Sequence, residues 1–281
     1  MMPTQQEKFE LFRDLHRREE TFVVPNPWDT GSARLLSTMG FEALATTSAG
    51  YAFSAGIRDS LTGLSRDEVL HNAARIVQAT HLPVTADLQD GFGPGPETCA
   101  GTIRLAAQAG LVGGSIEDAT GDPSAPVYDL PQAVERVRAA VEAARDQPFL
   151  VTARAENHLF GLHDLAETIT RLQAFSAAGA DVLYAPGLPN LKAIRTVCES
   201  VDKPVNVVIG LTGPAYSVAE LAEAGVRRIS LGGSLARTAF GALARAAREI
   251  VANGTFTFTE GALPGSDITA IMRQENLDTR L

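Results

Sequence analysis

The feature of this sequence that most constrains its fold is a regular alternation of short apolar runs with longer helical patterns. Eight runs rich in Val, Ile and Ala occur at 22–25, 43–46, 83–87, 113–117, 149–154, 181–184, 205–209 and 228–231. Helical patterns follow them at 30–38, 66–79, 97–109, 130–144, 164–178, 190–200, 217–224 and 234–252. Such strands are typical of a parallel sheet covered by helices. Eight units predict a (β/α)8 TIM-type barrel, with an open doubly wound sheet as the alternative.

Two segments lie outside this alternation. Residues 4–19 predict an extra N-terminal amphipathic helix that covers the bottom of the barrel. A C-terminal helical extension follows the last barrel helix, with a short helix near 266–275. Since no Ser/Gly-rich linker divides the chain, we expect one domain over 1–281, with the barrel core at 20–252. The extension at 253–281 is expected to pack on a neighbouring subunit or across the barrel mouth.

Charge and composition exclude several classes of protein. The 281 residues carry 24 Lys and Arg against 33 Asp and Glu, a net charge of −9, which argues against nucleic acid or anionic membranes as partners. There is no apolar run of transmembrane length, and the first 20 residues are too polar for a signal peptide. Two cysteines, Cys99 and Cys198, cannot form a disulfide framework. We expect a cytoplasmic protein with reduced thiols.

Acidic residues gather where the predicted strands end. Asp87, Asp90, Glu117 and Asp118 follow the third and fourth strands, and Arg154 ends the fifth. Active residues of (β/α)8 barrels stand at these carboxyl ends, so the carboxylates should converge. A hard divalent cation would relieve their repulsion, which favours Mg²⁺, with Mn²⁺ as an alternative. Arg154 suits a substrate carboxylate. The alternative interpretation is a structural network of ion pairs.

Two features after the second strand extend this candidate site. Thr47, Ser48 and Ala49 are small, so their backbone N–H groups could approach a ligand oxygen, although such a segment is often only a turn. The glycine-containing segment 48–64 predicts a long loop, and loops of that length are often functional lids. Asp59 on this loop could close over the pocket, or it could simply be solvated beside Arg58.

Seven ordered motifs resemble those of the isocitrate lyase/phosphoenolpyruvate mutase superfamily. They are PNPWDTGSARLL, TTSAGYAFSAGIRDS, VTADLQDGFG, GGSIEDATGD, VTARAENH, PVNVVIG and RRISLGGSLAR, and they span about residues 20–250. The resemblance implies a (β/α)8 barrel, a Mg²⁺ ion and a small 2-oxo acid, dicarboxylate or enolate as ligand. It also implies a homo-oligomer, a dimer or more usually a tetramer, whose subunits exchange the eighth helix.

The resemblance assigns metal and catalytic roles residue by residue. Asp87 matches the first acid of the D-x-D-T-G-[FY]-G motif, the closest metal ligand, and Glu117 matches the acid that holds metal-bound water. Arg154 matches the arginine that grips the substrate. Gln89 stands where the second acid of the motif would be, and Asp90 stands where its Thr would be. This departure leaves open whether Asp90 replaces the lost carboxylate as a metal ligand.

The remaining roles concern the substrate. Thr47, Ser48 and Ala49 match the segment whose backbone and hydroxyl contact the ligand's carboxylate, and Asn206 on the seventh strand is assigned to substrate binding with them. Asp59 matches the gating-loop aspartate of the mutase branch, and it joins Arg154 and Glu117 as a candidate catalytic residue.

The loop after the fourth strand selects among the branches of the superfamily. Its sequence, ATGDPSAP, lacks the K-[KR]-C-G-H motif of isocitrate and methylisocitrate lyases, which disfavours a true isocitrate lyase. The leading hypothesis is a Mg²⁺-dependent lyase that acts on a small 2-oxo acid through a metal-stabilised enolate, such as oxaloacetate decarboxylation or C–C bond cleavage. The alternatives are a mutase-type C–P activity on phosphonopyruvate, and a non-catalytic 2-oxo acid binding protein, since Gln89 replaces an acid.

Overall fold

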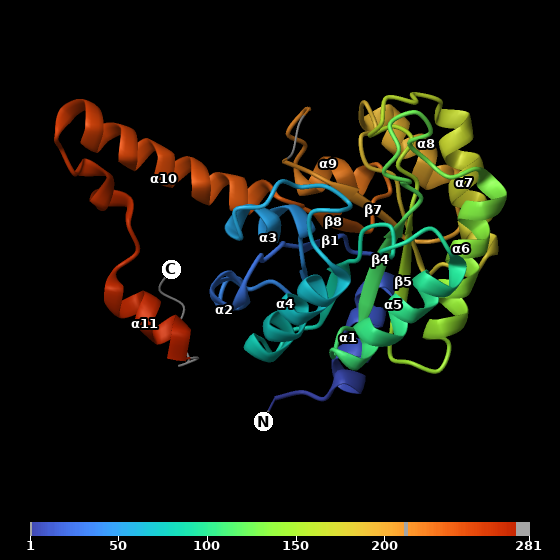
Figure 1. The fold of residues 1–281 in the computed structure, drawn as a ribbon, viewed down its shortest axis with the longest axis horizontal. Helices are drawn as coiled ribbons and strands as arrows, with labels where there is room; N and C mark the ends of the chain where they lie inside the picture. Colours follow the sequence, from blue (N-terminus) through green and yellow to red (C-terminus); the bar gives the residue numbers. More distant parts are fainter. Residues whose placement is uncertain (1, 211–212, 274–281) are drawn as a thin grey trace.

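Eight short strands pair in parallel in the computed structural model, which describes residues 2–210 and 213–273 (Figure 1). The strands are β1 (Phe22–Val24), β2 (Leu44–Ala45), β3 (Val84–Asp87), β4 (Gly113–Glu117), β5 (Leu150–Arg154), β6 (Val182–Tyr184), β7 (Val205–Val208) and β8 (Arg228–Ser230). Their order is β1-β8-β7-β6-β5-β4-β3-β2. This arrangement, with helices outside, confirms the predicted (β/α)8 barrel.

The barrel closes between β1 and β2 through a few polar contacts. These strands stand at the two ends of the hydrogen-bonded order. The Ala45 amide donates to the Pro25 carbonyl at 3.0 Å. The buried Asn26 side chain donates to the Thr46 carbonyl at 2.9 Å, and its Oδ1 accepts from Leu231 N at 2.8 Å and Gly232 N at 3.0 Å. One amide side chain therefore joins segments that extend β1, β2 and β8.

Helices cover the outside of the barrel. They are α2 (Thr30–Ser37), α3 (Ser48–Ser54), α4 (Arg66–Ala79), α5 (Pro96–Gln108), α6 (Leu130–Ala144), α7 (Leu165–Ala177), α8 (Leu191–Ser200) and α9 (Val218–Glu223). Side chains cap many of their first turns, as Ser65 and Glu68 do reciprocally at α4. A cap of this kind satisfies backbone N–H groups that have no partner within the helix. The capping residues thus fix where the helices begin.

Helix α3 corrects the expectation of an irregular loop over 48–64. The first half of that segment is helical, and Thr47 begins it by accepting a hydrogen bond from Gly50 N at 3.2 Å. Gly50 faces a crowded surface, because a Cβ there would lie 2.6 Å from Thr47 Cγ2 and 3.0 Å from Trp28 Cβ. Two turns are too short to show a helical period in the sequence. The irregular remainder, 55–65, follows α3.

The predicted N-terminal helix, α1 (Gln5–Arg17), packs at the amino ends of the strands. Its Phe12 is fully buried in a cluster with Phe22, Val24, Val112 and Leu150. His16 lies edge-on to the rings of Phe12 and Phe22, with Nδ1 2.7 Å from the Phe12 carbonyl oxygen. Burial, and then the charge of Arg228, lower the pKa of His16 to about 3. The imidazole is therefore neutral, and its Nε2 accepts from Arg228 Nη1 at 3.3 Å.

The C-terminal part departs from the compact barrel. Helix α10 (Ser234–Asn253) extends away from it, and η1 (Thr257–Gly261) and α11 (Gly265–Arg273) follow (Figure 1). Arg34 of α2 donates to the Met272 carbonyl of α11. Large apolar side chains are exposed along this part, namely Phe240, Leu243, Ile250, Val251, Phe256, Phe258, Leu263 and Ile268. The end of the helix predicted near 266–275 lies outside the described residues. In the part of the chain that the structure describes, no helix has the length and apolarity needed to span a bilayer.

Candidate active site

Three charged side chains meet at the carboxyl ends of adjacent strands. Asp87, Glu117 and Arg154 are the last residues of β3, β4 and β5, and Glu117 is in register with Arg154. Arg154 Nη1 lies 2.9 Å from Glu117 Oε1 and 3.3 Å from Asp87 Oδ1. The structure thus brings together the metal and substrate candidates from the ends of the strands.

Two further residues contact Arg154, and neither is predicted from the sequence to have a role. Glu156 is 1% exposed, and its Oε1 lies 2.7 Å from Arg154 Nε. The guanidinium carbon of Arg154 lies 4.7 Å from the ring centroid of Tyr184, its register neighbour on β6. The short Arg-x-Glu spacing was the available signal for Glu156, whereas the ring contact depends on the strand register. One guanidinium therefore faces three carboxylates and an aromatic ring.

The carboxylates outnumber the cation, and their pKa values reflect this. Burial raises the pKa of Glu117 well above its ordinary value, Arg154 opposes the rise, and Glu156, Asp87 and Asp90 add to it. Burial also raises the pKa of Glu156, and again Arg154 opposes it. A buried carboxyl group with a raised pKa is stabilised by taking up a proton or by an additional positive charge nearby.

The carboxylate of Asp87 is held through both of its oxygens. Ser48 donates to Asp87 Oδ2 from its hydroxyl at 2.6 Å and from its backbone N–H at 3.2 Å. Gln89 N donates to Asp87 Oδ1 at 3.3 Å. The Asp87 backbone N–H in turn donates to Thr46 Oγ1 at 3.2 Å. The residues after β2 therefore orient a candidate metal ligand on β3.

Two of the other substrate candidates, Thr47 and Asn206, line a small cavity beside Arg154. This cavity measures ≈ 60 Å³, and its lining includes Thr47, Tyr184 and Asn206. The Thr47 hydroxyl is used to cap α3, and Ala49 lies in the first turn of that helix. Asn206 is 1% exposed and uses both ends of its amide inside the barrel, donating to Ser230 Oγ at 3.0 Å and accepting from Arg228 Nε at 2.8 Å. Asn206 thus forms part of the cavity floor.

The side chains of Asp90 and Asp118 form hydrogen bonds with partners other than Asp87 and Glu117. Asp90 Oδ1 accepts from Phe92 N at 2.9 Å, within a tight turn where Gln89 and Phe92 have φ values of 49° and 64°. Asp118 accepts from Glu156 N at 2.8 Å and from Arg171 Nη1 at 3.0 Å. The left-handed backbone of this turn directs Asp90 to its own loop, so its hydrogen bonding does not favour it as a replacement metal ligand.

The loop that carries Asp59 is bonded to the turn after β3. The buried Gln89 side chain donates from Nε2 to the Ser60 carbonyl at 3.3 Å. Asp59 is exposed on this loop, but partial desolvation and then Asp87 raise its pKa, and Arg154 opposes the rise. Asp59 therefore lies within electrostatic reach of the charged cluster.

The donor set suits a hard cation bound by few protein ligands. Among residues 2–210 and 213–273, no group of three His, Cys, Asp or Glu side chains is arranged to hold a metal ion. Magnesium needs no such group, because it commonly takes one or two carboxylates together with water and substrate oxygens. Asp87 and Glu117 supply oxygen ligands, and the excess of carboxylates over Arg154 favours another positive charge. The residues present fit Mg²⁺ in this way.

Comparisons with known proteins agree with this architecture. The model of the phosphoenolpyruvate phosphomutase family matches residues 12–251. The 2-methylisocitrate lyase of Escherichia coli (strain K12) is 29% identical over 76% of this chain and 75% of its own length. The oxaloacetate decarboxylase of Pseudomonas savastanoi pv. phaseolicola (strain 1448A / Race 6) is 30% identical over 77% of this chain and 75% of its own.

A solved structure extends the comparison over nearly the whole chain. A protein from Burkholderia cenocepacia J2315, described as a candidate lyase/mutase, is 56% identical with a TM-score of 0.92, covering 94% of this chain and 95% of its own. With a family model that matches most of its length, the chain belongs to the phosphoenolpyruvate phosphomutase family, within the isocitrate lyase/phosphoenolpyruvate mutase superfamily.

Proposed function

We propose that this protein is a Mg²⁺-dependent lyase of small 2-oxo acids, with oxaloacetate decarboxylation as its simplest reaction. The observation that carries the proposal is Arg154, set against Asp87, Glu117 and Glu156 at the mouth of the barrel. The lyase and decarboxylase relatives support the assignment of a C–C lyase enzyme that acts on small oxo acids. The missing K-[KR]-C-G-H motif favours a reaction that needs no cysteine acid.

The chain's own residues bind and orient the substrate. The Arg154 guanidinium binds the carboxylate of the 2-oxo acid, while Glu156 and the Tyr184 ring fix its plane. Ser48 orients the Asp87 carboxylate by donating two hydrogen bonds to its Oδ2. Mg²⁺, held by Asp87 and through water by Glu117, would supply Lewis-acid stabilisation of negative charge on the substrate oxygens.

The reaction then requires little further acid–base chemistry. In decarboxylation the C–C bond to the departing carboxylate breaks, CO2 leaves, and the electron pair remains on the substrate as an enolate. Solvent later protonates the carbon, which gives pyruvate. If the leaving group is instead an aldehyde or ketone, a base must take the proton of its parent alcohol. Asp59, with a raised pKa beside the charged cluster, is placed for that step.

The test follows oxaloacetate by NMR in the presence of Mg²⁺. Pyruvate should form well above the rate with metal alone and above the rate of an Asp87→Ala variant. No excess over both controls would overturn the decarboxylase proposal. Binding of oxalate without turnover of any 2-oxo acid would instead identify a non-catalytic binding protein.

A mutase-type activity is the second candidate function. The position of Asp59 near Asp87 and Arg154 favours it, because the gating-loop aspartate is the feature shared with the mutase branch. If the protein is a mutase, it should turn over phosphonopyruvate, which phosphorus NMR can monitor. An Asp59→Ala variant should lose that turnover. Turnover of oxaloacetate but not of phosphonopyruvate would reject it.

We further propose that the protein is a cytoplasmic homo-oligomer, a dimer or tetramer that exchanges α10 between subunits. The exposed apolar side chains of α10 and of the segment after it support this assembly. In this proposal the chain is one domain, residues 20–252 form the barrel core, and 253–281 reach a neighbouring subunit beyond the contact that α11 makes with α2 of its own chain. The free thiols of Cys99 and Cys198 are compatible with a reducing compartment.

A further inference from the structure

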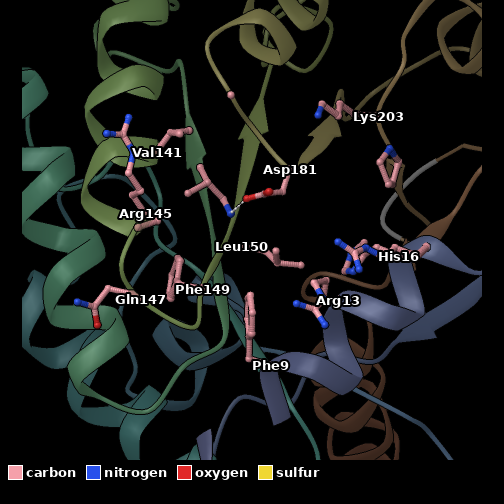
Figure 2. Close-up of a pocket in the computed structure, with 15 residues that line it drawn as sticks. Phe9, Arg13, His16, Val141, Arg145, Gln147, Phe149, Leu150, Asp181 and Lys203 are labelled. Carbon is pink, nitrogen blue, oxygen red and sulfur yellow. Dashed lines mark hydrogen bonds between the residues drawn. The ribbon is translucent and has the colours of Figure 1, made fainter. Parts of the chain in front are cut away.

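A larger cavity lies at the opposite end of the barrel from the candidate active site (Figure 2). It measures ≈ 420 Å³, which is within the range of about 300–1,000 Å³ found for small-molecule sites. Helix α1, the end of α6, the start of β5 and the segments before β6 and β7 form its walls. Val151 lines it near the start of β5, whereas Arg154 stands at the other end of the same strand. The two sites are therefore separate.

The floor of this cavity is apolar and partly aromatic. Phe9, Phe149 and Leu150 line it and lie between Arg145 and Arg13 in the view of Figure 2. Val141 and Ala144 of α6 continue the apolar wall. Phe149 is only 3% exposed, so the aromatic surface that remains for a planar apolar group is the half-buried Phe9 ring, which has the Arg13 guanidinium 5.7 Å from its centroid.

The rim of the cavity carries four cations. Arg13, Arg17, Arg145 and Lys203 line it, in a chain whose net charge is −9. In Figure 2, Arg145 lies on one side, and Arg13 and Lys203 lie on the other. His16 also lines the cavity but is neutral, because burial and Arg228 lower its pKa to about 3.

Acidic groups near the rim offset part of this charge. Asp181 is the one carboxylate among the described residues that line the cavity, and its Oδ2 accepts from Val151 N at 2.8 Å. Lys203 interacts electrostatically with Asp181 and Asp202. Glu142 pairs with Arg145, and Asp14 lies 3.8 Å from Arg13 Nε. Within residues 2–210 and 213–273, neither Arg17 nor Lys203 has a carboxylate oxygen within 4.0 Å.

We propose that this cavity binds an organic polyanion with a planar apolar body, which is the chemistry of a nucleotide. The apolar surface beside Phe9 takes the planar body, and the cationic rim takes the charged groups. A dicarboxylate without an apolar body would leave the floor unused, so this ligand differs from the substrate bound at Arg154. The inference does not rest on the proposed lyase function.

Isothermal titration calorimetry in EDTA tests this site with three probes. ATP carries both parts of the proposed ligand, adenosine carries the planar body alone, and pyrophosphate carries the charge alone. ATP should bind about tenfold or more tightly than either part, and added NaCl should weaken it, because salt screens charges on an exposed rim. Equal affinity for ATP and pyrophosphate, or for ATP and adenosine, would overturn the proposal.

Matched variants locate the binding. Arg145→Ala with Lys203→Ala should weaken ATP binding about tenfold, since two rim charges are lost. Arg138→Ala with Lys192→Ala removes the same charges from exposed positions on α6 and α8 outside the lining, and should leave the affinity unchanged. An Arg154→Lys variant should also bind ATP normally. Equal weakening in both double variants, or loss of binding in the Arg154 variant, would place ATP elsewhere and reject this site.

Discussion

At the residue scale, the candidate active site depends on one guanidinium that satisfies several partners at once. Arg154 contacts Glu117 and Asp87 through Nη1 and Glu156 through Nε, and its face lies over Tyr184. The planar fork of arginine can serve all of these partners because its donors point in fixed directions. An ammonium group has the charge but not the geometry.

An Arg154→Lys variant separates charge from geometry. The lysine keeps one positive charge among the carboxylates but cannot donate two parallel hydrogen bonds to a substrate carboxylate. We therefore expect kcat/KM for the 2-oxo acid to fall about a hundredfold or more. Steady-state kinetics with oxaloacetate measure the fall, and circular dichroism checks that the fold is intact. Activity close to that of the unmodified enzyme would show that a point charge is sufficient.

Gln89 stands where the D-x-D-T-G-[FY]-G motif would have its second acid, and its amide makes a contact that a carboxylate cannot make. It donates to the Ser60 carbonyl on the loop that carries Asp59. Both Gln89→Leu and Gln89→Glu remove this donor, so hydrogen exchange of the amides at 55–65 should become faster in both variants. If only the Glu variant exchanges faster, charge repulsion rather than the lost donor explains the change.

His16 makes stability depend on pH. Its pKa is about 3 in the folded protein against an ordinary 6.5, so below 6.5 the unfolded chain takes up a proton that the folded protein does not. The contribution of His16 to the free energy of unfolding is therefore complete above about pH 6.5, and it is lost as the pH falls towards 3. His16→Gln keeps a donor and an acceptor but does not titrate. Between about pH 7 and about pH 5 the unmodified protein should lose about 2 kcal/mol more than this variant in urea unfolding. Equal losses would contradict the low pKa.

At the element scale, the sequence predicted the strands and most helices, because caps and apolar runs are local signals. The prediction of helices at 66–79 and 130–144 matches α4 and α6 to the residue, and Ser65 and Asp129 cap them. Asp87, Glu117 and Arg154 were found because parallel strands end at one edge of a barrel. Helix α3 was not predicted, because two turns are too short to show a helical periodicity in the sequence. The orientation of Asp90 depends on the positive φ of Gln89, which the sequence does not reveal.

Gly50 tests how α3 is held against the barrel. A methyl group at this position would lie 2.6 Å from Thr47 Cγ2, so Gly50→Ala should lower the free energy of unfolding by about 1–3 kcal/mol. Gly241 on α10 is the control, because a Cβ there meets only the end of the Arg245 side chain at 3.4 Å. Gly241→Ala should be neutral or stabilising by about 0.5–1 kcal/mol, as expected within a helix. Thermal unfolding of both variants gives the comparison, and equal effects would reject this account of α3.

At the scale of the whole molecule, helix α10 leaves apolar surface without cover within the described chain. Leu243 is 65% exposed and Val251 is 88% exposed. In the proposed assembly, Leu243→Glu with Val251→Glu should shift the protein to a smaller species in analytical ultracentrifugation. Leu11→Glu on α1, where the leucine is 56% exposed, is the matched control and should not change the mass. An unmodified protein that already sediments as a monomer would reject the assembly.

The seam between β1 and β2 makes the barrel unequal around its circumference. Elsewhere, backbone ladders join neighbouring strands, but here the Asn26 amide and the Ala45–Pro25 bond carry the closure. Regions with few backbone hydrogen bonds open at lower free energy than the rest of a fold. Local opening should therefore begin along this line, beside Thr47 and Ser48. The wall of the candidate site that holds Asp87 in place is thus also the part of the barrel that yields first.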